Sequence, residues 1–298
     1  MAVWSDDFSE DTSQNYAILW RNVTGGRGYG NPPESTSITV SDGYLTAEIT
    51  NSGYCKGIVY LKAKPTVNPL TENFVIEVRG RSHGWDGFAS GITLAVDRVP
   101  EGSGNFEKFI RFVYSTYPSP DRIELQTHQR TLVSMDSDVD TEKTMCTFGP
   151  WNKFRIEKDG TWWKFFFNDN LIWEGEIPEA DEEMYIGFTV DVTSGESGWT
   201  AINTYDDYYF ALYPFGEITN ISSPSSAHAG DSLSVSVDVK NTGSDGTIWC
   251  RLVDTYDDSE IGIRQESYLA SEEIKTFSWV ITMPNRDLTV RVEAGHEE

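Results

Sequence analysis

The chain has 298 residues, with 23 Lys and Arg against 47 Asp and Glu, which gives a formal net charge of −24 at pH 7. This excess of negative charge repels phosphate, so we expect neither nucleic-acid binding nor insertion into an anionic membrane. No apolar run approaches the roughly 20 residues that a membrane helix needs. Aromatic residues make up 13% of the chain, enough for a sizeable core, and the composition excludes collagen, coiled coil and wholesale disorder.

The N-terminal segment, Met1 to Phe8, shows neither the basic stretch nor the apolar stretch that opens a secretory signal. With no signal peptide visible, we expect a protein that is used without this export route, or one whose signal has been removed.

Three cysteines, Cys55, Cys146 and Cys250, are too few and too scattered for a disulfide framework. No Cys or His spacing suits zinc. A disulfide between Cys55 and Cys146 is one interpretation. Two separate buried thiols are the one we favour.

Apolar and polar residues alternate with a period of two from residue 38 to residue 212, which predicts β-strands. Ser41-Asp42-Gly43 joins one predicted hairpin and Asp159-Gly160 joins another. Further alternating segments lie at 74–78, 92–96, 109–114, 123–127, 171–173 and 186–192. No window of helical length shows an apolar stripe with helical spacing. About twelve short strands separated by Gly, Asn and Asp turns indicate an all-β fold, an antiparallel β-sandwich.

The pattern changes near Tyr213-Pro214-Phe215-Gly216 and becomes rich in Ser with short loops. Residues 233–239 then alternate strictly between Leu or Val and Ser or Asp. About 80 residues of this kind suit a small sandwich. We therefore place one domain at residues 1–213 and a second at residues 218–298.

Within the first domain, W-N-K-F-R-I-E-K-D-G at 151–160, followed by W-K-F-F-F-N-D-N-L-I at 163–172, resembles a hairpin of concanavalin A-like and laminin-G-like jelly rolls. Asp6-Asp7-Phe8 resembles the opening of that group, and 185–188 with 205–210 resembles its closing pair of strands. The resemblance covers the whole first domain and implies a jelly roll. It implies no single function, because this fold hosts lectins, adhesion modules and glycosidases.

The second domain carries A-G-D-S-L-S-V at 229–235 and V-D-V-K-N-T-G at 237–243. These segments resemble the cell-adhesion-related Ig-like module of prokaryotic surface proteins. The resemblance implies a small Ig-like β-sandwich that serves as a spacer or stalk.

The glucanase branch of the jelly-roll group uses an E-x-D-x-E strand, whose two carboxylates flank the scissile bond. No such strand occurs, and the nearest segment, Ile123 to His128, has one acid where three are needed. Nucleophile-elbow, zinc-protease and P-loop motifs are absent from the sequence, and the four His residues are scattered. We therefore expect no enzymatic activity and no required cofactor.

One group of acids is a candidate for a structural Ca²⁺, a cation that takes six to eight oxygen ligands. The first and last strands of a jelly roll are neighbours, and related sandwiches hold a structural Ca²⁺ near such paired ends. The resemblance therefore implies that four acids distant in sequence converge: Asp6, Asp7, Asp206 and Asp207. Solvent-facing acids at strand ends are the alternative.

Saccharide sites on sandwiches combine an aromatic ring that stacks on the sugar with polar groups that fix its hydroxyls. Four aromatic residues on glycine- or serine-flanked loops are candidates for carbohydrate binding: Tyr29, Trp85, Tyr117 and Trp199. Each suits a sugar platform and a loop-packing anchor equally. Trp162 and Trp163 are adjacent on one predicted strand and face opposite sides, so one of them lies outside the main core.

Adhesion-type modules without a catalytic or export signature favour a non-catalytic structural protein of a virion surface, such as a decoration, spike or tail-fibre subunit. Its partners would be capsid or tail subunits, or host glycans, and homo-oligomerisation stays open. One alternative is a secreted or cell-surface glycan-binding protein similar to lectins. A second is a divergent glycoside hydrolase. The expected location is accordingly the virion surface or the extracellular space.

Overall fold

The computed structural model describes residues 2–22, 35–51, 55–83, 89–98, 106–115, 122–136, 151–192 and 199–296. These residues form antiparallel strands and one short 3-10 turn, η1 (Ser13–Asn15), and no α-helix occurs among them. The all-β sandwich class is therefore confirmed. No helix in the described ranges is long and apolar enough to cross a membrane.

The chain divides into two compact units. The first unit comprises Trp4–Leu70 and Val75–Phe210, and the second comprises Ala211–Glu298 with Met1–Val3 and Thr71–Phe74. Each unit is described separately below.

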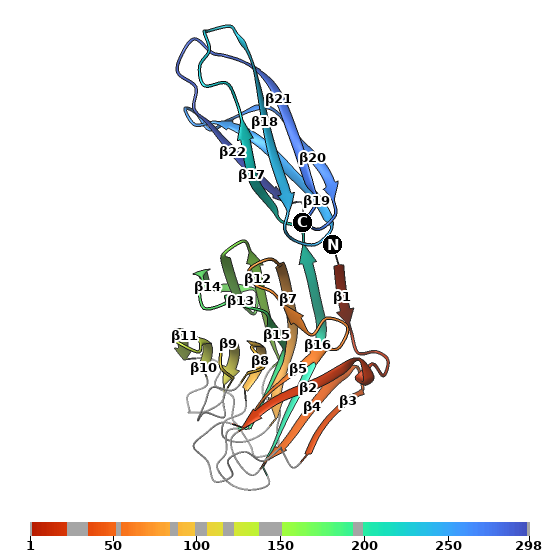
Figure 1. The fold of residues 1–298 in the computed structure, drawn as a ribbon. Helices are drawn as coiled ribbons and strands as arrows, with labels where there is room; N and C mark the ends of the chain where they lie inside the picture. The colour runs from red at the N-terminus through yellow and green to blue at the C-terminus, as the bar shows by residue number, and fades with distance from the viewer. Residues whose placement is uncertain are drawn as a thin grey trace. The chain divides into compact units, whose positions relative to one another are not determined.

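Two large sheets form the layers of the first unit (Figure 1). Sheet A has the strand order β14 (Asn170–Glu176), β13 (Trp162–Phe167), β12 (Asn152–Asp159), β7 (Asn73–His83), β16 (Trp199–Tyr213), β4 (Tyr44–Asn51) and β3 (Ser35–Ser41), and β1 (Ala2–Asp6) also pairs with β16. Sheet B has the order β11 (Thr131–Asp136), β10 (Arg122–Thr127), β9 (Phe109–Ser115), β8 (Ala89–Ala95), β15 (Met184–Val192), β5 (Cys55–Leu61) and β2 (Tyr16–Asn22), and β6 (Thr66–Val67) also pairs with β15.

The core between these sheets is built from the alternating positions of their strands. Phe112 of β9 contacts Phe154 of β12 and Phe165 of β13 edge to face, with ring centroids 5.4 and 5.5 Å apart. Trp163 is 1% exposed in this core, whereas its neighbour Trp162 is 46% exposed on the other side of the sheet. The expectation that one of the two tryptophans lies outside the core is thus confirmed.

Sheet B is interrupted between β8 and β15. Their paired residues run from Tyr185 opposite Ala95 to Phe188 opposite Ile92 and stop there. The next residue of β8, Gly91, has a φ of 150°, which favours glycine, and a Cβ there would lie 2.2 Å from the Phe112 carbonyl oxygen.

A side chain of sheet A supplies hydrogen bonds at this interruption. The Asn203 amide nitrogen donates to the carbonyl oxygens of Ala89 and Thr189 at 2.7 and 2.6 Å. The Tyr205 hydroxyl also donates to the Thr189 carbonyl oxygen. Buried carbonyl groups are costly without a partner, so Asn203 keeps the two strands in place where their ladder stops.

The second unit also consists of two sheets around a core. Sheet C has the order β17 (Gly216–Ser222), β18 (Ser232–Asn241) and β21 (Ile274–Thr282), and sheet D has the order β20 (Ser259–Leu269), β19 (Gly246–Asp254) and β22 (Val290–His296). Val235, Val237 and Val239 are buried, so the alternation seen in the sequence does mark a core-facing strand. The Ig-like identity of this unit stays a prediction.

The cysteines are separate features of the two units. Cys55 is buried in the first unit, and its predicted alternative partner, Cys146, lies outside the described residues. Cys250 is a buried free thiol in the core of the second unit, and burial raises its pKa to about 11.

Replacing Asn203 with Leu tests the bridge across sheet B. The variant keeps the side-chain size but leaves the buried Ala89 carbonyl oxygen without its side-chain donor, while the Thr189 carbonyl oxygen still accepts the Tyr205 hydroxyl. We expect the free energy of unfolding, measured by urea titration, to fall by about 2–3 kcal/mol. Asn170→Leu, at an exposed turn amide, serves as the control and should change stability by about 0.5 kcal/mol or less. Equal losses in the two variants would contradict this role.

Candidate functional site

The four acids proposed for calcium lie on strands that are neighbours, since β1 pairs with β16. The carboxylates of Asp206 and Asp207 lie 3.3 and 3.0 Å from one guanidinium nitrogen of Arg79, a residue of β7. Burial, followed by the neighbouring Asp207, raises the pKa of Asp206. An arginine therefore already supplies positive charge to this half of the group.

The other half is bound by local hydrogen bonds. Asp6 accepts the Tyr16 hydroxyl at 3.0 Å, and Asp7 accepts the backbone N–H of Ser9 at 3.1 Å. In the ranges that the structure describes, no three His, Cys, Asp or Glu side chains group so as to hold a metal ion. Calcium at these residues stays a prediction.

The predicted sugar platforms fall mostly beyond the described structure. Tyr29, Trp85 and Tyr117 lie outside the described residues. Trp199 opens β16, where its backbone pairs with Asn51, and its side chain is outside the description. These four assignments stay predictions.

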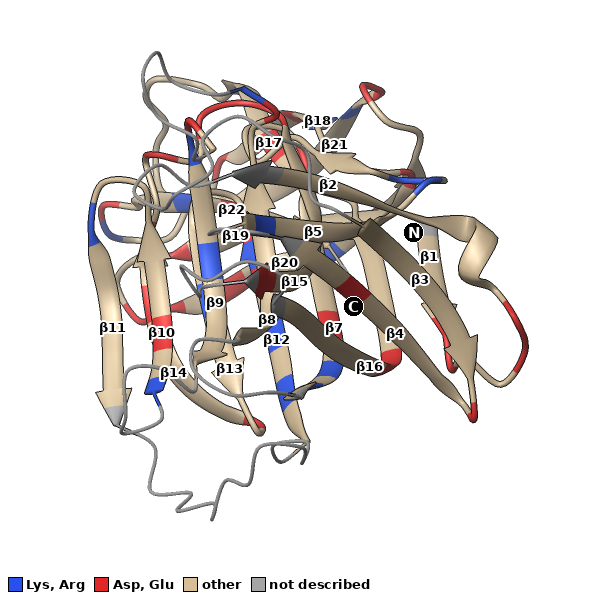
Figure 2. Cartoon of the chain, turned by 90° about the horizontal axis from the view of Figure 1, so that it is seen from below, with Lys and Arg blue, Asp and Glu red and all other residues tan. Residues whose placement is uncertain are grey.

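The structure reveals a different polar group, on the face of sheet B that points away from the core. Opposite positions of neighbouring strands share this face, as the pairs Asp191 with Lys56 and Thr93 with Arg111 show. We call the group the polar platform, and it comprises Lys56, Thr93, Arg111, Glu124, Thr189 and Asp191. The adjacent strands β9 and β10 carry basic and acidic positions side by side (Figure 2).

Arg111 connects three strands of the platform. One of its guanidinium nitrogens contacts the Asp191 carboxylate on β15, and the other lies 3.9 Å from the Glu124 carboxylate on β10. The path from β9 to β15 crosses β8, where Gly91 adds no side chain. The Arg111 and Asp191 side chains are only 10% and 2% exposed, so the pair is held in a fixed, largely desolvated geometry.

Two threonines make a second connection over the same interruption. The hydroxyls of Thr93 on β8 and Thr189 on β15 are 2.7 Å apart, and both residues are buried. Charged groups and hydroxyls therefore form one ordered, largely buried polar network across four strands.

Lys56 lies beside this network, with its ammonium nitrogen 5.1 Å from the centroid of the Phe109 ring. Burial, and secondly the positive charge of Arg111, lower the pKa of Lys56 to about 8, while Asp191 and Glu124 act in the opposite direction. A cation over an aromatic face is stabilised by the ring quadrupole.

The other end of the same face is aromatic and apolar. Tyr60 and Tyr185 pack edge to face with centroids 5.1 Å apart, and Phe106 packs on Ile58 and Ala95. The outward face of sheet B thus places aromatic rings next to polar groups, which is the combination that saccharide sites use.

The outward positions of β9 are Phe109, Arg111, Val113 and Ser115, and none of them is a carboxylate. The two carboxylates of the platform, Glu124 and Asp191, lie against the same guanidinium. Within the platform, these two carboxylates therefore share one cation.

Of the six residues of the polar platform, the sequence analysis considered only Glu124 as a candidate for chemistry. Arg111 and Asp191 are 80 positions apart in the chain, and only the strand register brings them together. A charged residue inside an otherwise apolar strand, as in F-I-R-F-V at 109–113, was the signal available.

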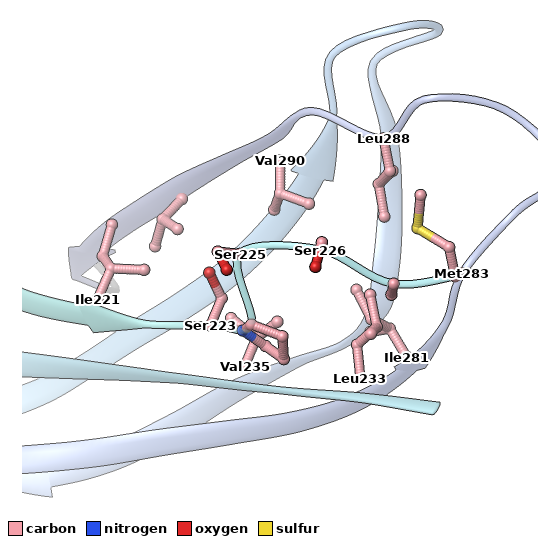
Figure 3. Close-up of a pocket in the computed structure, with 13 residues that line it drawn as sticks. Ile221, Ser223, Ser225, Ser226, Leu233, Val235, Ile281, Met283, Leu288 and Val290 are labelled. Atoms are coloured by element: carbon pink, nitrogen blue, oxygen red, sulfur yellow. The ribbon is translucent and has the colours of Figure 1, made fainter. Parts of the chain in front are cut away.

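A pocket of ≈ 260 Å³ lies in the second unit (Figure 3). Its lining side chains are apolar or serine, including Leu233, Val235, Ile281 and Val290, and none of them is titratable. Val235 and Ile281 also belong to the core of this unit. The pocket is an unfilled end of that core and offers no groups for chemistry.

No protein-family model and no curated protein matches the chain. Among solved structures, a laminarinase from Flavobacterium sp. UMI-01 is 14% identical, with a TM-score of 0.45 over 70% of this chain and 98% of that one. The carbohydrate recognition domain of Emp47p is 13% identical, with a TM-score of 0.43 over 70% and 93%. A Bacillus subtilis protein of unknown function with a galectin-like fold is 10% identical, with a TM-score of 0.46 over 70% and 94%.

Likeness at these identities describes the fold alone, and it agrees with the concanavalin A-like jelly roll that the first domain resembles. Other matching structures include a β-glucanase from Bacillus licheniformis and a laminarinase catalytic domain from Thermotoga maritima. The prediction of a virion decoration, spike or tail-fibre protein is wrong, because the structures named here are glycan hydrolases, a carbohydrate recognition domain and a galectin-like protein. The capsid or tail partners expected with it are likewise unsupported.

Replacing Arg111 with Met tests the central ion pair. The variant leaves Asp191, 1% exposed, as a buried charge without its partner, and we expect a loss of about 3–5 kcal/mol in the free energy of unfolding. Additional replacement of Asp191 with Leu should recover most of that loss, because it removes the unpaired charge.

The matched control is Arg98→Met. Arg98 pairs with Glu107 and Glu182, but its side chain is 58% exposed. This variant should lose about 1 kcal/mol or less. Similar losses at Arg98 and Arg111 would show that Arg111 does not hold a desolvated pair.

Proposed function

We propose that the protein binds saccharides on the outward face of sheet B and does not cleave them. The observation that carries the proposal is the polar platform, in which Arg111 holds Asp191 and Glu124 in a fixed arrangement beside the ring of Phe109. Ordered polar groups beside an aromatic ring are the chemistry of sugar recognition.

A sugar presents hydroxyls that both donate and accept hydrogen bonds, together with apolar C–H faces. Carboxylates accept such bonds, guanidinium and ammonium groups donate them, and threonine hydroxyls do both. The platform contains all three kinds of group within a single sheet face, and Lys56 and Glu124 are its members with exposed area, since the other four are buried. Because its ion pairs are already formed, little side-chain entropy is lost when a ligand arrives.

Binding without hydrolysis is supported by the chemistry of β9. Arg111 occupies the outward position of β9 between Phe109 and Val113, and a guanidinium neither attacks an anomeric carbon nor donates a proton at neutral pH. The alternative that the experiment must exclude is that the protein is a divergent glycoside hydrolase.

With this function we propose that the protein is secreted or lies on the cell surface, where polysaccharides occur. The four aromatic residues placed on loops by the sequence are the proposed additional stacking rings: Tyr29, Trp85, Tyr117 and Trp199. Structural calcium at the Asp6 and Asp206 strand ends remains part of the proposal and is independent of sugar contact.

The test is direct binding of the full chain to a panel of neutral and acidic polysaccharides, with reducing-sugar release measured on the same panel. We expect binding to at least one class and no release of reducing ends. Phe109→Ala should weaken that binding about tenfold, which corresponds to about 1.4 kcal/mol for a lost stacking ring.

Trp162→Ala is the control, since Trp162 is 46% exposed on the outward side of sheet A. It should leave binding unchanged. Thermal unfolding of both variants separates a lost contact from a lost fold. Absence of binding across the panel would refute the proposed function, and reducing ends released by the wild type would identify a hydrolase instead.

A further inference from the structure

Lys56 differs from the other charged residues of the polar platform because no carboxylate of the described residues lies within ion-pair distance of it. The Phe109 ring lies beside it, with its centroid 5.1 Å from the ammonium nitrogen. The strand register sets Asp191 of β15 opposite Lys56. However, the Asp191 carboxylate is turned to Arg111.

The charges of the platform explain why this ammonium has no ion-pair partner among the described residues. Arg111 serves both Asp191 and Glu124 with one guanidinium. Among the described residues, Asp191 and Glu124 lie within ion-pair distance of Arg111 and act on Lys56 only at longer range.

A half-buried ammonium without a counter-ion costs free energy, because the charge has lost part of its hydration. Lys108, by contrast, contacts the carboxylates of Asp181 and Glu182. The cost at Lys56 is offset when a ligand brings the missing negative charge into the same surface.

We propose that Lys56 binds an anionic group of the ligand, so that the platform selects an acidic polysaccharide over a neutral one. The ligand would carry a carboxylate or a sulfate on a sugar ring. The Lys56 ammonium would contact this anionic group, and the sugar ring would stack on Phe109. This inference rests on the proposed saccharide binding and adds the class of ligand to it.

The net charge of −24 does not oppose such binding at short range. At physiological salt, exposed charges are screened beyond about 8 Å, whereas a partly desolvated contact is screened much less. The groups adjacent to the bound anion therefore determine the preference.

The pH dependence follows from the groups around Lys56, which are Arg111 on β9, Glu124 on β10 and Asp191 on β15, with Arg21 of β2 opposite in the register. Because the pKa of Lys56 is lowered to about 8, the free protein loses this positive charge as pH rises from 7 to 9. Affinity for an acidic polysaccharide should fall over that range, and affinity for a neutral one should not.

The experiment compares alginate, which carries carboxylates, a sulfated galactan, which carries sulfates, and a neutral β-glucan, each titrated into the full chain. We expect the wild type to prefer one or both acidic probes. Lys56→Met should lower that affinity tenfold or more, and Lys56→Arg should retain it because the charge is kept.

Lys62→Met is the matched control, because Lys62 lies just beyond the same strand, is exposed, and changes the net charge equally. It should bind as the wild type does, and thermal unfolding confirms that each variant is folded. If the wild type binds the neutral probe alone, or if Lys56→Met and Lys62→Met lose equal affinity, the inference is overturned while saccharide binding stands. If no probe of any class binds, both proposals are overturned.

Discussion

The interruption of sheet B between β8 and β15 is the constraint on which its outward face depends. Where the ladder stops after Phe188 and Ile92, two carbonyl groups turn to the Asn203 amide on the core side. On the outward side, Arg111 reaches over the same place to Asp191. At this place β8 carries Gly91, where a Cβ would lie 2.2 Å from the Phe112 carbonyl oxygen of β9. One backbone irregularity thus supports a polar core contact and a polar platform together.

Burying the Arg111–Asp191 ion pair lowers the free energy of unfolding relative to an apolar pair. Desolvating a carboxylate and a guanidinium costs several kcal/mol per ion, and a well-packed apolar pair would often do as well. The ion pair instead fixes geometry, because a paired Arg111 cannot rotate freely and holds the side chains that it contacts in place. A sheet face that served only solubility would carry exposed charges, as Arg98 does at 58% exposure, and would need no buried pair.

The alternation of residues predicted the strands, the Asp159-Gly160 hairpin and the opposite facing of Trp162 and Trp163, because each of these depends on near neighbours in the chain. The adjacency of β1 and β16 was also predictable from the jelly-roll resemblance. The insertion of Arg79 against Asp206 was not, because it comes from a third strand, β7. The polar platform depends entirely on register across five strands, and nothing local in the sequence specifies that register.

The fold alone does not separate a lectin from a hydrolase, because both classes share it. What separates them is the chemistry of the few outward side chains on the central strands of one sheet. Hydrolysis needs one carboxyl group on each side of the glycosidic bond, whereas in this chain a guanidinium at Arg111 occupies the middle of β9 and draws Glu124 and Asp191 to itself. Carboxylates that share one guanidinium in this way do not face each other across a bond. In the proposed function, the same ion pairs therefore order the platform and keep its two carboxylates on one cation.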